Sequence, residues 1–255
     1  MRYQQEIDQA VAHYRALLES QVQRAENMAA GAEQAKKEKL VIGLVGGDGI
    51  GPIITKQAEK ALRKLLAEEI AQGKIELRII EGLTIENRLA QGKAVPEDVL
   101  AAIKQCDVLL KGPTTTPSGG TMESANVTLR RELDLFANVR PVSVPEAGID
   151  WTFFRENTEG EYTLGSKGIE IPGLLTMDFK VTTVEGTRRI ARAAFDFARA
   201  NGKTHLSIVT KSNIMKKTDG MFSAICHEIA AEYPEITVEE YYIDIMTDRK
   251  STRLN

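Results

Sequence analysis

The sequence predicts an α/β fold in two parts: a large domain built on a mixed, mostly parallel sheet, incomplete in this chain, and a smaller α+β domain. Two observations predict it. Between residues 41 and 113, short apolar runs alternate with helical apolar stripes, which is the pattern of parallel strands joined by crossover helices. Beyond residue 140 the chain becomes rich in strand and turn residues, which is typical of an α+β domain.

The N-terminal residues 1–38 are predicted to be an appended helical segment. Apolar residues recur every three or four positions from Ile7 to Val22 among Gln, Glu and Arg, which indicates an amphipathic helix ending near Gly31. A polar connector follows. We expect this segment to pack or to oligomerise rather than to react.

Residues 39–140 are predicted to form the first part of the large domain. Its strands are β-branched apolar runs, and its first long helix keeps one apolar stripe. In chain order we expect a strand at 41–45, a helix at 52–71, a strand at 75–80, a helix ending at 105 and a strand from 107.

Residues 141–250 are predicted to form the smaller α+β domain, which also carries dimer-forming elements. It opens with a long strand-rich and turn-rich stretch. Further on we expect a helix at 183–200, a strand at 205–210, a helix at 219–233 and a strand at 236–243.

Composition excludes several classes of protein. The formal net charge of −3 comes from 33 basic and 36 acidic residues, so we expect no nucleic-acid partner. No run of 18 apolar residues occurs, so we expect no membrane span. The start of the chain carries Glu6 and Asp8, unlike a signal or transit peptide, which predicts a cytoplasmic protein. Cys106 and Cys226 are too few for a disulfide framework and are expected to be packing residues.

A glycine-rich turn, GGDGIGP, follows the first strand from Gly46 to Pro52. Its glycines at 47, 49 and 51 are two residues apart, so it is not the G-x-G-x-x-G dinucleotide motif. Taken alone it is weak evidence, because a tight backbone or a proline at the first helical position explains it equally well.

A second block, LLKGPTTTPSGGTMESANVTLRRELDLFANVRP, combines hydroxyls near a helix start with arginines. Guanidinium groups bind carboxylates bidentately and a helix N-terminus favours negative charge, so the block suits a polyanionic acid. The alternative is that Arg130 and Arg131 form a solvated helix face. The candidate residues here are Lys111, Thr115, Thr116, Ser124, Asn126, Arg130 and Arg140.

Three later blocks carry groups suited to proton transfer or metal binding. FFRENTEGEY holds Arg155 and Tyr162, and a phenol close to positive charges is suited to proton exchange. TKSNIMKKTDG holds Lys211, whose use as a base requires desolvation or nearby cations. EEYYIDIMT holds Asp244, a single carboxylate, which does not by itself make a magnesium site. Taken without the surrounding motifs, Tyr162 would be read as a solvent-exposed tyrosine on a strand, and Lys211 as a solvent-exposed charge.

These five blocks, in register from Val41 to about Thr247, resemble the β-decarboxylating dehydrogenases, and isocitrate dehydrogenase in particular. The resemblance implies the isocitrate/isopropylmalate dehydrogenase-like fold and the oxidative decarboxylation of isocitrate, a hydroxy-tricarboxylate, to 2-oxoglutarate. It implies NAD or NADP and Mg²⁺ or Mn²⁺ as cofactors, and a homodimer in which the lysine and the aspartate reach into the neighbouring subunit's site.

The resemblance also assigns roles to individual residues. It implies proton transfer by Tyr162 and Lys211, substrate binding by Ser124, Asn126, Arg130, Arg140 and Arg155, cofactor binding by Lys111, Thr115, Thr116 and Asn213, and metal binding by Asp244. We expect the three substrate arginines to converge on one pocket that Lys211 and Tyr162 also face.

The end of the sequence departs from the family pattern. The residues from Asp248 on, DRKSTRLN, do not resemble the family's continuation with its further metal-binding aspartates. We therefore expect a C-terminally truncated member, with residues 251–255 as an unrelated tail, that is inactive alone. Robust isocitrate-dependent NAD(P)H formation by this chain would refute that expectation.

Rival functions stay open within and outside the enzyme class. Dehydrogenases of isopropylmalate, homoisocitrate or tartrate share the decarboxylating machinery, although the polar Ser124 and Asn126 favour a third substrate carboxylate over an isopropyl group. A non-catalytic regulatory subunit of isocitrate dehydrogenase is a further alternative. The joint presence of Tyr162, Lys211 and Asp244 favours the catalytic interpretation.

Overall fold

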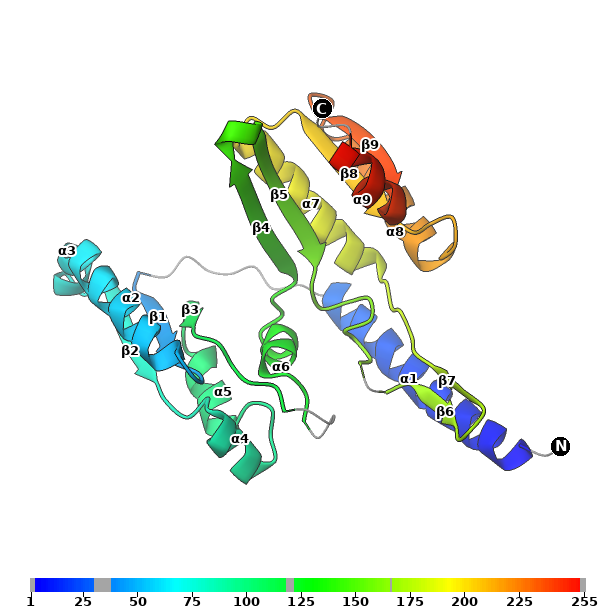
Figure 1. The fold of residues 1–255 in the computed structure, drawn as a ribbon, viewed down its shortest axis with the longest axis horizontal. Helices are drawn as coiled ribbons and strands as arrows, with labels where there is room; N and C mark the ends of the chain where they lie inside the picture. The colour runs from blue at the N-terminus through cyan, green and yellow to red at the C-terminus, as the bar shows by residue number, and fades with distance from the viewer. Residues whose placement is uncertain (1–2, 30–37, 118–121, 166, 253–255) are drawn as a thin grey trace. The chain divides into compact units, whose positions relative to one another are not determined.

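The computed structural model describes residues 3–29, 38–117, 122–165 and 167–252 (Figure 1). The chain divides into two compact units. Unit 1 comprises residues 1–32 and 136–255, and unit 2 comprises residues 33–135. The domain boundaries predicted at 38, 140 and 250 stay predictions, and residues 253–255 of the predicted tail lie outside the described part of the chain.

Unit 2 is a layered α/β structure. Its three described strands form a parallel sheet in the order β2-β1-β3. Its core gathers apolar side chains of the sheet and of α5 and α6, among them Val45, Ile103 and Leu129. The strands are β1 (Leu40–Val45), β2 (Ile75–Ile80) and β3 (Val108–Lys111), and the helices are α2 (Gly51–Leu65), α3 (Ala67–Ala71), α4 (Ile85–Gln91), α5 (Glu97–Lys104) and α6 (Ala125–Glu132).

The helix predicted at 52–71 is wrong as a single element. It is broken at Leu66, whose φ of −106° and ψ of 22° lie outside helical geometry, and α3 continues beyond the break. The apolar stripe runs through the break unchanged, so hydrophobic periodicity does not mark it.

Unit 1 contains two antiparallel hairpins and a parallel strand pair. The first hairpin, β4 (Ala137–Val144) with β5 (Ile149–Glu156), turns through a short 3₁₀ helix, η1 (Pro145–Ala147). The second pairs β6 (Ile169–Ile171) with β7 (Leu175–Met177). The remaining elements are α1 (Gln4–Ala29), α7 (Val184–Ala200), β8 (His205–Thr210), α8 (Thr218–Ala230), β9 (Thr237–Tyr242) and α9 (Ile243–Thr252). The α/β and α+β character predicted from the sequence is therefore confirmed.

The core of unit 1 lies between α7, α8 and the parallel pair β8–β9. Its most buried side chains include Phe195, Ile208 and Ile229. Cys226 belongs to this core, and burial raises the pKa of its thiol to about 12. The predicted strand at 205–210 is found with the same bounds, and the helix predicted at 183–200 begins one residue later because Thr183 is its N-cap.

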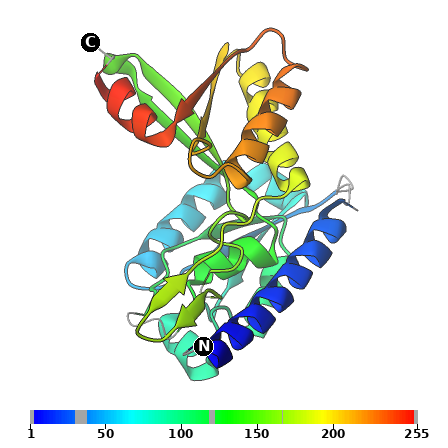
Figure 2. The same ribbon diagram turned by 90° about the vertical axis from the view of Figure 1, so that its right-hand side faces the viewer.

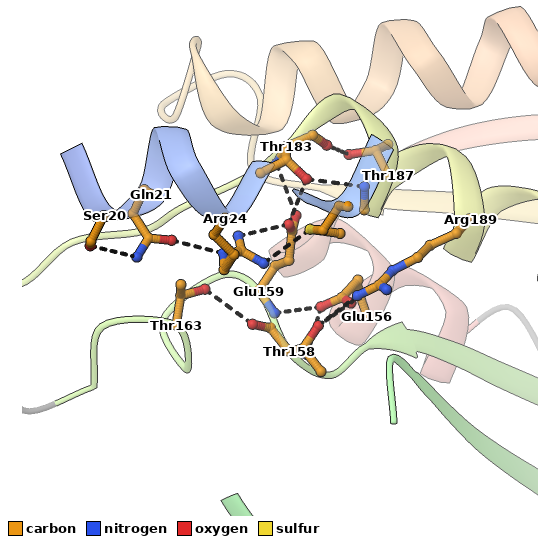
Figure 3. A network of polar contacts seen from close by, with 12 residues as sticks. Ser20, Gln21, Arg24, Glu156, Thr158, Glu159, Thr163, Thr183, Thr187 and Arg189 are labelled. Carbon is orange, nitrogen blue, oxygen red and sulfur yellow. Dashed lines mark hydrogen bonds and ion pairs between the residues drawn. The ribbon is translucent and has the colours of Figure 1, made fainter. Parts of the chain in front are cut away.

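Helix α1 is one long, straight helix (Figure 1 and Figure 2). It is attached to the rest of unit 1 by a polar network around the buried Glu159 (Figure 3). Arg24 donates from Nη2 to Oε1 of Glu159 at 3.0 Å, and the same carboxylate accepts from the backbone and hydroxyl of Thr183 at 2.9 and 2.6 Å. A Cβ at Gly186 would lie 2.4 Å from Glu159, so only glycine fits there. None of the described helices is long and apolar enough to cross a membrane.

Candidate functional site

The candidate residues fall into three local groups. The first lies in unit 2, at the carboxyl ends of the parallel strands β1 and β3, which is the edge where ligands bind in open α/β sheets. Lys111 ends β3 and the exposed Thr115 and Thr116 follow it. Ser124, Asn126 and Arg130 sit half-buried at the start and in the body of α6.

The glycine-rich turn is explained by close backbone contact at this edge. The amide of Asp48 donates to the carbonyl of Pro113 at 2.7 Å. A Cβ at Gly47 would lie 2.0 Å from that carbonyl oxygen, and one at Gly112 would lie 2.0 Å from the carbonyl oxygen of Gly46. Two turns thus touch through their main chains, and a side chain at either glycine would separate them.

Asp48 and Arg88 fix the loop that bears the candidates, and the sequence-based prediction missed both. Asp48 is buried and accepts from the amides of Ile85 and Thr115, each at 2.7 Å. Arg88 is fully buried and donates to the carbonyls of Ala94 at 2.7 Å, Thr115 at 2.6 Å and Glu123 at 3.5 Å. The two ends of the loop that carries the threonines are therefore held by one guanidinium.

Lys111 is a partly desolvated cation beside this loop. Its Nζ donates to the carbonyl of Gly112 at 2.7 Å and to the hydroxyl of Thr114 at 3.2 Å. Burial lowers the pKa of Lys111, the Asp48 carboxylate opposes the change, and the charges of Arg88 and Arg130 lower the pKa further. Arg130 is thus close enough to Lys111 to act on it.

The structure separates the two adjacent arginines of α6. Arg131 is exposed and makes a bidentate contact with Glu123, at 2.9 Å from Nη1 and 2.8 Å from Nη2. Arg130 is half-buried and makes no ion pair with a described residue. The interpretation as a solvated face therefore fits the exposed Arg131 better than the half-buried Arg130, whose role in substrate binding stays a prediction. At the helix start, Ser124 makes no side-chain capping bond within the described residues.

The second group lies on one face of the β4–β5 hairpin in unit 1. Opposed residues of an antiparallel pair point the same way, so Asn138 and its partner Arg155 share a face with Arg140. The other face carries Phe154, whose ring lies 5.2 Å from that of Phe197 on α7. The arginine face is therefore directed away from α7 and is exposed at both arginines.

A chain of amide hydrogen bonds organises this face. Arg140 donates from Nε to Oδ1 of Asn138 at 3.0 Å, and Asn138 donates to Oδ1 of the buried Asn157 at 3.3 Å. Arg155 donates to the same Asn157 oxygen at 3.2 Å, and its Cζ lies 5.2 Å from the centre of the Tyr162 ring. The two asparagines were not predicted, because nothing in the sequence marks them as the link between both arginines and the tyrosine.

The third group joins the end of β8 to the start of α9. Lys211 donates from Nζ to Oδ1 of Asp244 at 2.8 Å, and this hydrogen bond lowers the pKa of the exposed Asp244. The Lys211 amide donates to the buried Asp219 at 2.7 Å, and Lys180 contacts the other oxygen of Asp219 at 2.5 Å. Asn213 is exposed two residues further on.

Comparisons with known proteins identify the family of this chain. The family model of isocitrate/isopropylmalate dehydrogenase matches residues 41–250, most of the chain. This chain belongs to that family. The family and the fold predicted from the sequence are therefore confirmed.

Three similar proteins illustrate the relationship. The chain is 36% identical over 207 residues to isocitrate dehydrogenase (NAD) regulatory subunit 1, mitochondrial, of Arabidopsis thaliana, covering 79% of this chain and 53% of that one. It is 38% identical over 212 residues to isocitrate dehydrogenase (NAD) catalytic subunit 5, mitochondrial, of the same plant, covering 79% and 53%. A crystal structure of isocitrate dehydrogenase from Methylococcus capsulatus superposes with a TM-score of 0.71 at 32% identity, covering 84% of this chain and 64% of that chain. The chain thus spans about half the length of these curated relatives.

The predicted cytoplasmic location is wrong. Both curated relatives of this dehydrogenase family member are named as mitochondrial subunits. The prediction rested on the acidic start of the chain, and residues 1–38 lie outside the matched region 41–250. Those residues therefore say nothing about the compartment of the family.

The described residues do not make a complete metal site. No group of three or more His, Cys, Asp or Glu side chains gathers anywhere in the described part of the chain. Asp244 offers one carboxylate, and Lys211 is hydrogen-bonded to it. Since Mg²⁺ prefers six oxygen ligands, this single carboxylate does not hold the ion by itself.

The structure brings together some of the predicted site residues and not others. Arg140, Arg155 and Tyr162 form one group, and Lys211 with Asp244 another. Arg130 lies in the other unit. The convergence of all three arginines with Lys211 and Tyr162 on one pocket stays a prediction.

Proposed function

We propose that this protein binds isocitrate and takes part in its oxidative decarboxylation to 2-oxoglutarate, with NAD or NADP and with Mg²⁺ or Mn²⁺. One observation carries the proposal. Two exposed arginines share one hairpin face, their described hydrogen-bond partners are neutral amides, and the Tyr162 ring lies beside Arg155. An amide oxygen orients a guanidinium without neutralising it, so this face keeps its charge for a polyanionic acid.

Tyr162 is the candidate acid for the last proton transfer. Its ring lies beside the Arg155 guanidinium, whose Cζ is 5.2 Å from the ring centre, so the phenol stands next to a group that binds an anionic substrate. The side chain is half-buried, so it can exchange a proton with a bound substrate and with solvent. We assign it the protonation of the enol carbon after carbon dioxide has left.

Lys211 is the candidate for removing the proton of the substrate hydroxyl. Its backbone is fixed by Asp219 and its Nζ is oriented by Asp244, while the side chain itself stays only partly buried. The lysine and Asp244 form a group separate from Tyr162 in their described contacts. This separation is compatible with a homodimer in which Lys211 and Asp244 act at the neighbouring subunit's site.

Lys111, Thr115, Thr116 and Asn213 are proposed to contact the nicotinamide cofactor, which accepts the hydride from the substrate when bound. The exposed threonine hydroxyls lie at the carboxyl edge of a parallel sheet, where such a ligand fits. The main-chain amide of Thr115 already donates to Asp48, so only its hydroxyl is left to bind the cofactor.

Isocitrate is favoured over isopropylmalate by the start of α6. Ser124 and Asn126 present half-buried polar groups there, and Ser124 caps no amide of the helix. A buried polar group left without a partner costs about 1–3 kcal/mol, so an isopropyl group would be disfavoured at this position. Equal affinity for both acids would count against the assignment.

Binding of isocitrate can be followed with the single tryptophan of the chain. Trp151 lies on the arginine face of the hairpin, four residues along β5 from Arg155, so its fluorescence reports on a ligand at that face. We expect saturable binding of isocitrate and weaker binding of 3-isopropylmalate. No isocitrate-dependent change, together with no binding by calorimetry, would refute the proposed function.

A regulatory subunit, which binds without turnover, is the second candidate, since one of the Arabidopsis relatives carries that name. Isocitrate-dependent formation of NADH or NADPH separates the two. The chain alone is expected to bind without turnover, because its described residues supply only one predicted metal ligand. Mixed with a catalytic partner subunit, a regulatory chain would raise the partner's activity even with Tyr162→Phe. For a catalytic chain, Tyr162→Phe would abolish its own contribution.

A further inference from the structure

Helix α1 packs on the rest of unit 1 through one edge and leaves its apolar stripe exposed. The edge that packs on unit 1 carries Arg24, bonded to Glu159, and His13, whose Nε2 contacts the carbonyl oxygen of Lys167 at 3.0 Å. Leu17 is the one described apolar side chain of the helix that is buried, at 8% exposure. The adjacent stripe stays exposed by 36–56%: Ile7, Val11, Tyr14, Leu18 and Val22.

The spacing of this stripe is that of a helix-pairing seam. Its first four residues follow one another at intervals of four, three and four, which keeps them on one line along the helix. Tyr14 alone touches a described aromatic ring, that of Phe179 at 5.3 Å, and it still stays 45% exposed. Single exposed apolar residues need no explanation, but a continuous stripe of them marks a contact surface.

We propose that α1 pairs with α1 of a second copy of this chain, in antiparallel orientation about a twofold axis. In that arrangement Ile7 packs against Leu18 of the second copy and Val11 against Tyr14, and the symmetry repeats each layer. All four central layers are then apolar. The proposal does not depend on the proposed catalytic function.

Charge selects this orientation over the parallel one. Asp8 and Arg15 are exposed and lie on the same outer flank of the stripe, one heptad apart. In the antiparallel pair each Asp8 comes beside Arg15 of the second copy, giving two ion pairs of opposite charge. In a parallel pair the Arg15 flank would face the flank bearing Ala10 and Leu17, and no such ion pair would form.

The first test is the mass of the assembly formed by the whole chain, measured by light scattering and sedimentation. Val11→Glu places a charge in the central layer, and we expect the α1-dependent association constant to fall at least tenfold. Gln9→Glu is the matched control, because it adds the same charge on an exposed position away from the stripe. Association unaffected by Val11→Glu, or lowered equally by Gln9→Glu, would overturn the proposal.

Exchanging the charges of Asp8 and Arg15 then tests the register of the helix pair, and not only its non-specific hydrophobic association. Asp8→Arg and Arg15→Asp should each weaken association about threefold or more, because each creates two like-charge contacts. The double variant restores opposite charges and should recover association to within about twofold of the original chain. Circular dichroism confirms that α1 remains helical in every variant. Failure of the double variant to recover would contradict the antiparallel pairing even if the single variants weaken it.

Discussion

Arginine has two different roles in this chain, one in unit 2 and the other in unit 1. In unit 2, Arg88 is fully buried and its donors reach main-chain carbonyls on both sides of a loop. In unit 1, Arg140 and Arg155 are exposed and are oriented, among the described residues, by neutral asparagine oxygens. A guanidinium enclosed by carbonyls fixes the chain, whereas one held by an amide at the surface stays available to an anion.

The largest expected effect is on stability, from Arg88→Met. Methionine fills much of the volume of the fully buried Arg88 but leaves three main-chain carbonyls without this donor, so we expect the free energy of unfolding of unit 2 to fall by about 3–5 kcal/mol. Chemical denaturation followed by circular dichroism and by hydrogen exchange at residues 112–117 measures it.

Arg131→Met is the matched control for that prediction. Arg131 belongs to the same unit, but it is exposed and paired with Glu123, so its loss should cost no more than about 1 kcal/mol. Equal losses for both variants would show that burial among carbonyls does not distinguish the two settings.

The hairpin arginines should show the opposite behaviour. Arg155→Gln removes a charge from the exposed face, so isocitrate affinity is expected to fall about a hundredfold, or about 2.7 kcal/mol. The free energy of unfolding should change by less than about 1 kcal/mol, because the side chain is exposed. Titration followed by Trp151 fluorescence measures the affinity.

A control for Arg155 is available on α7. Arg192 is also exposed, but Glu232 engages both of its terminal nitrogens at 2.7 Å, so Arg192→Gln should leave isocitrate affinity unchanged. If Arg192→Gln weakens binding as much as Arg155→Gln, general charge rather than the hairpin face attracts the ligand.

Much of the fold could be predicted from the sequence because it follows from local patterns. The strand at 205–210, HLSIVT, is a short run rich in β-branched residues, and α7 begins after Thr183, whose hydroxyl accepts from the amide of Gly186. The break at Leu66 could not be predicted, since the apolar stripe on both sides of it is uninterrupted.

The site could be predicted only at residues that lie in a recognisable motif and also carry a chemically reactive group. The pairing of Lys211 with Asp244 and the closeness of Arg155 to Tyr162 join residues that motifs had already singled out. Arg88 was missed because its role depends on carbonyls 27 and 35 residues away, which no local pattern reveals. Asn138 was missed for the same reason, as its link to Asn157 exists only across the hairpin.

Asp219 is a buried carboxylate and, like Arg88, is a buried charged group that binds main-chain atoms. Burial alone would raise its pKa, but the hydrogen bonds from Lys180 and from the Lys211 amide outweigh burial, and the pKa is lowered. A lowered folded pKa adds stability that is present above the unfolded value, about 3.9, and is lost as the pH falls through the folded pKa.

We therefore expect the difference in free energy of unfolding between the original chain and an Asp219 variant to depend on pH. Asp219→Asn should lower the free energy of unfolding by about 2 kcal/mol at neutral pH, and the gap to the original chain should narrow below pH of about 4. Melting temperatures measured from pH of about 3 to 7 test it. A gap that is constant over this range would mean that the charge of Asp219 contributes nothing.

The smallest expected effect is on isocitrate affinity, from substitutions of Asn138 on the hairpin. They separate the charge beside Arg140 from the placement of its side chain. Asn138→Asp would put a carboxylate against Nε of Arg140, which neutralises the arginine and repels an anionic substrate, so isocitrate affinity should fall about tenfold. Asn138→Ala removes the same hydrogen bond but leaves Arg140 charged, so its affinity should fall no more than about threefold. Both variants lose the donated bond to Asn157, and only Asn138→Asp places a negative charge beside Arg140. Identical affinities would mean that the amide acts only by placing Arg140, and that the neutrality of its partner is not what keeps this face attractive to a tricarboxylate.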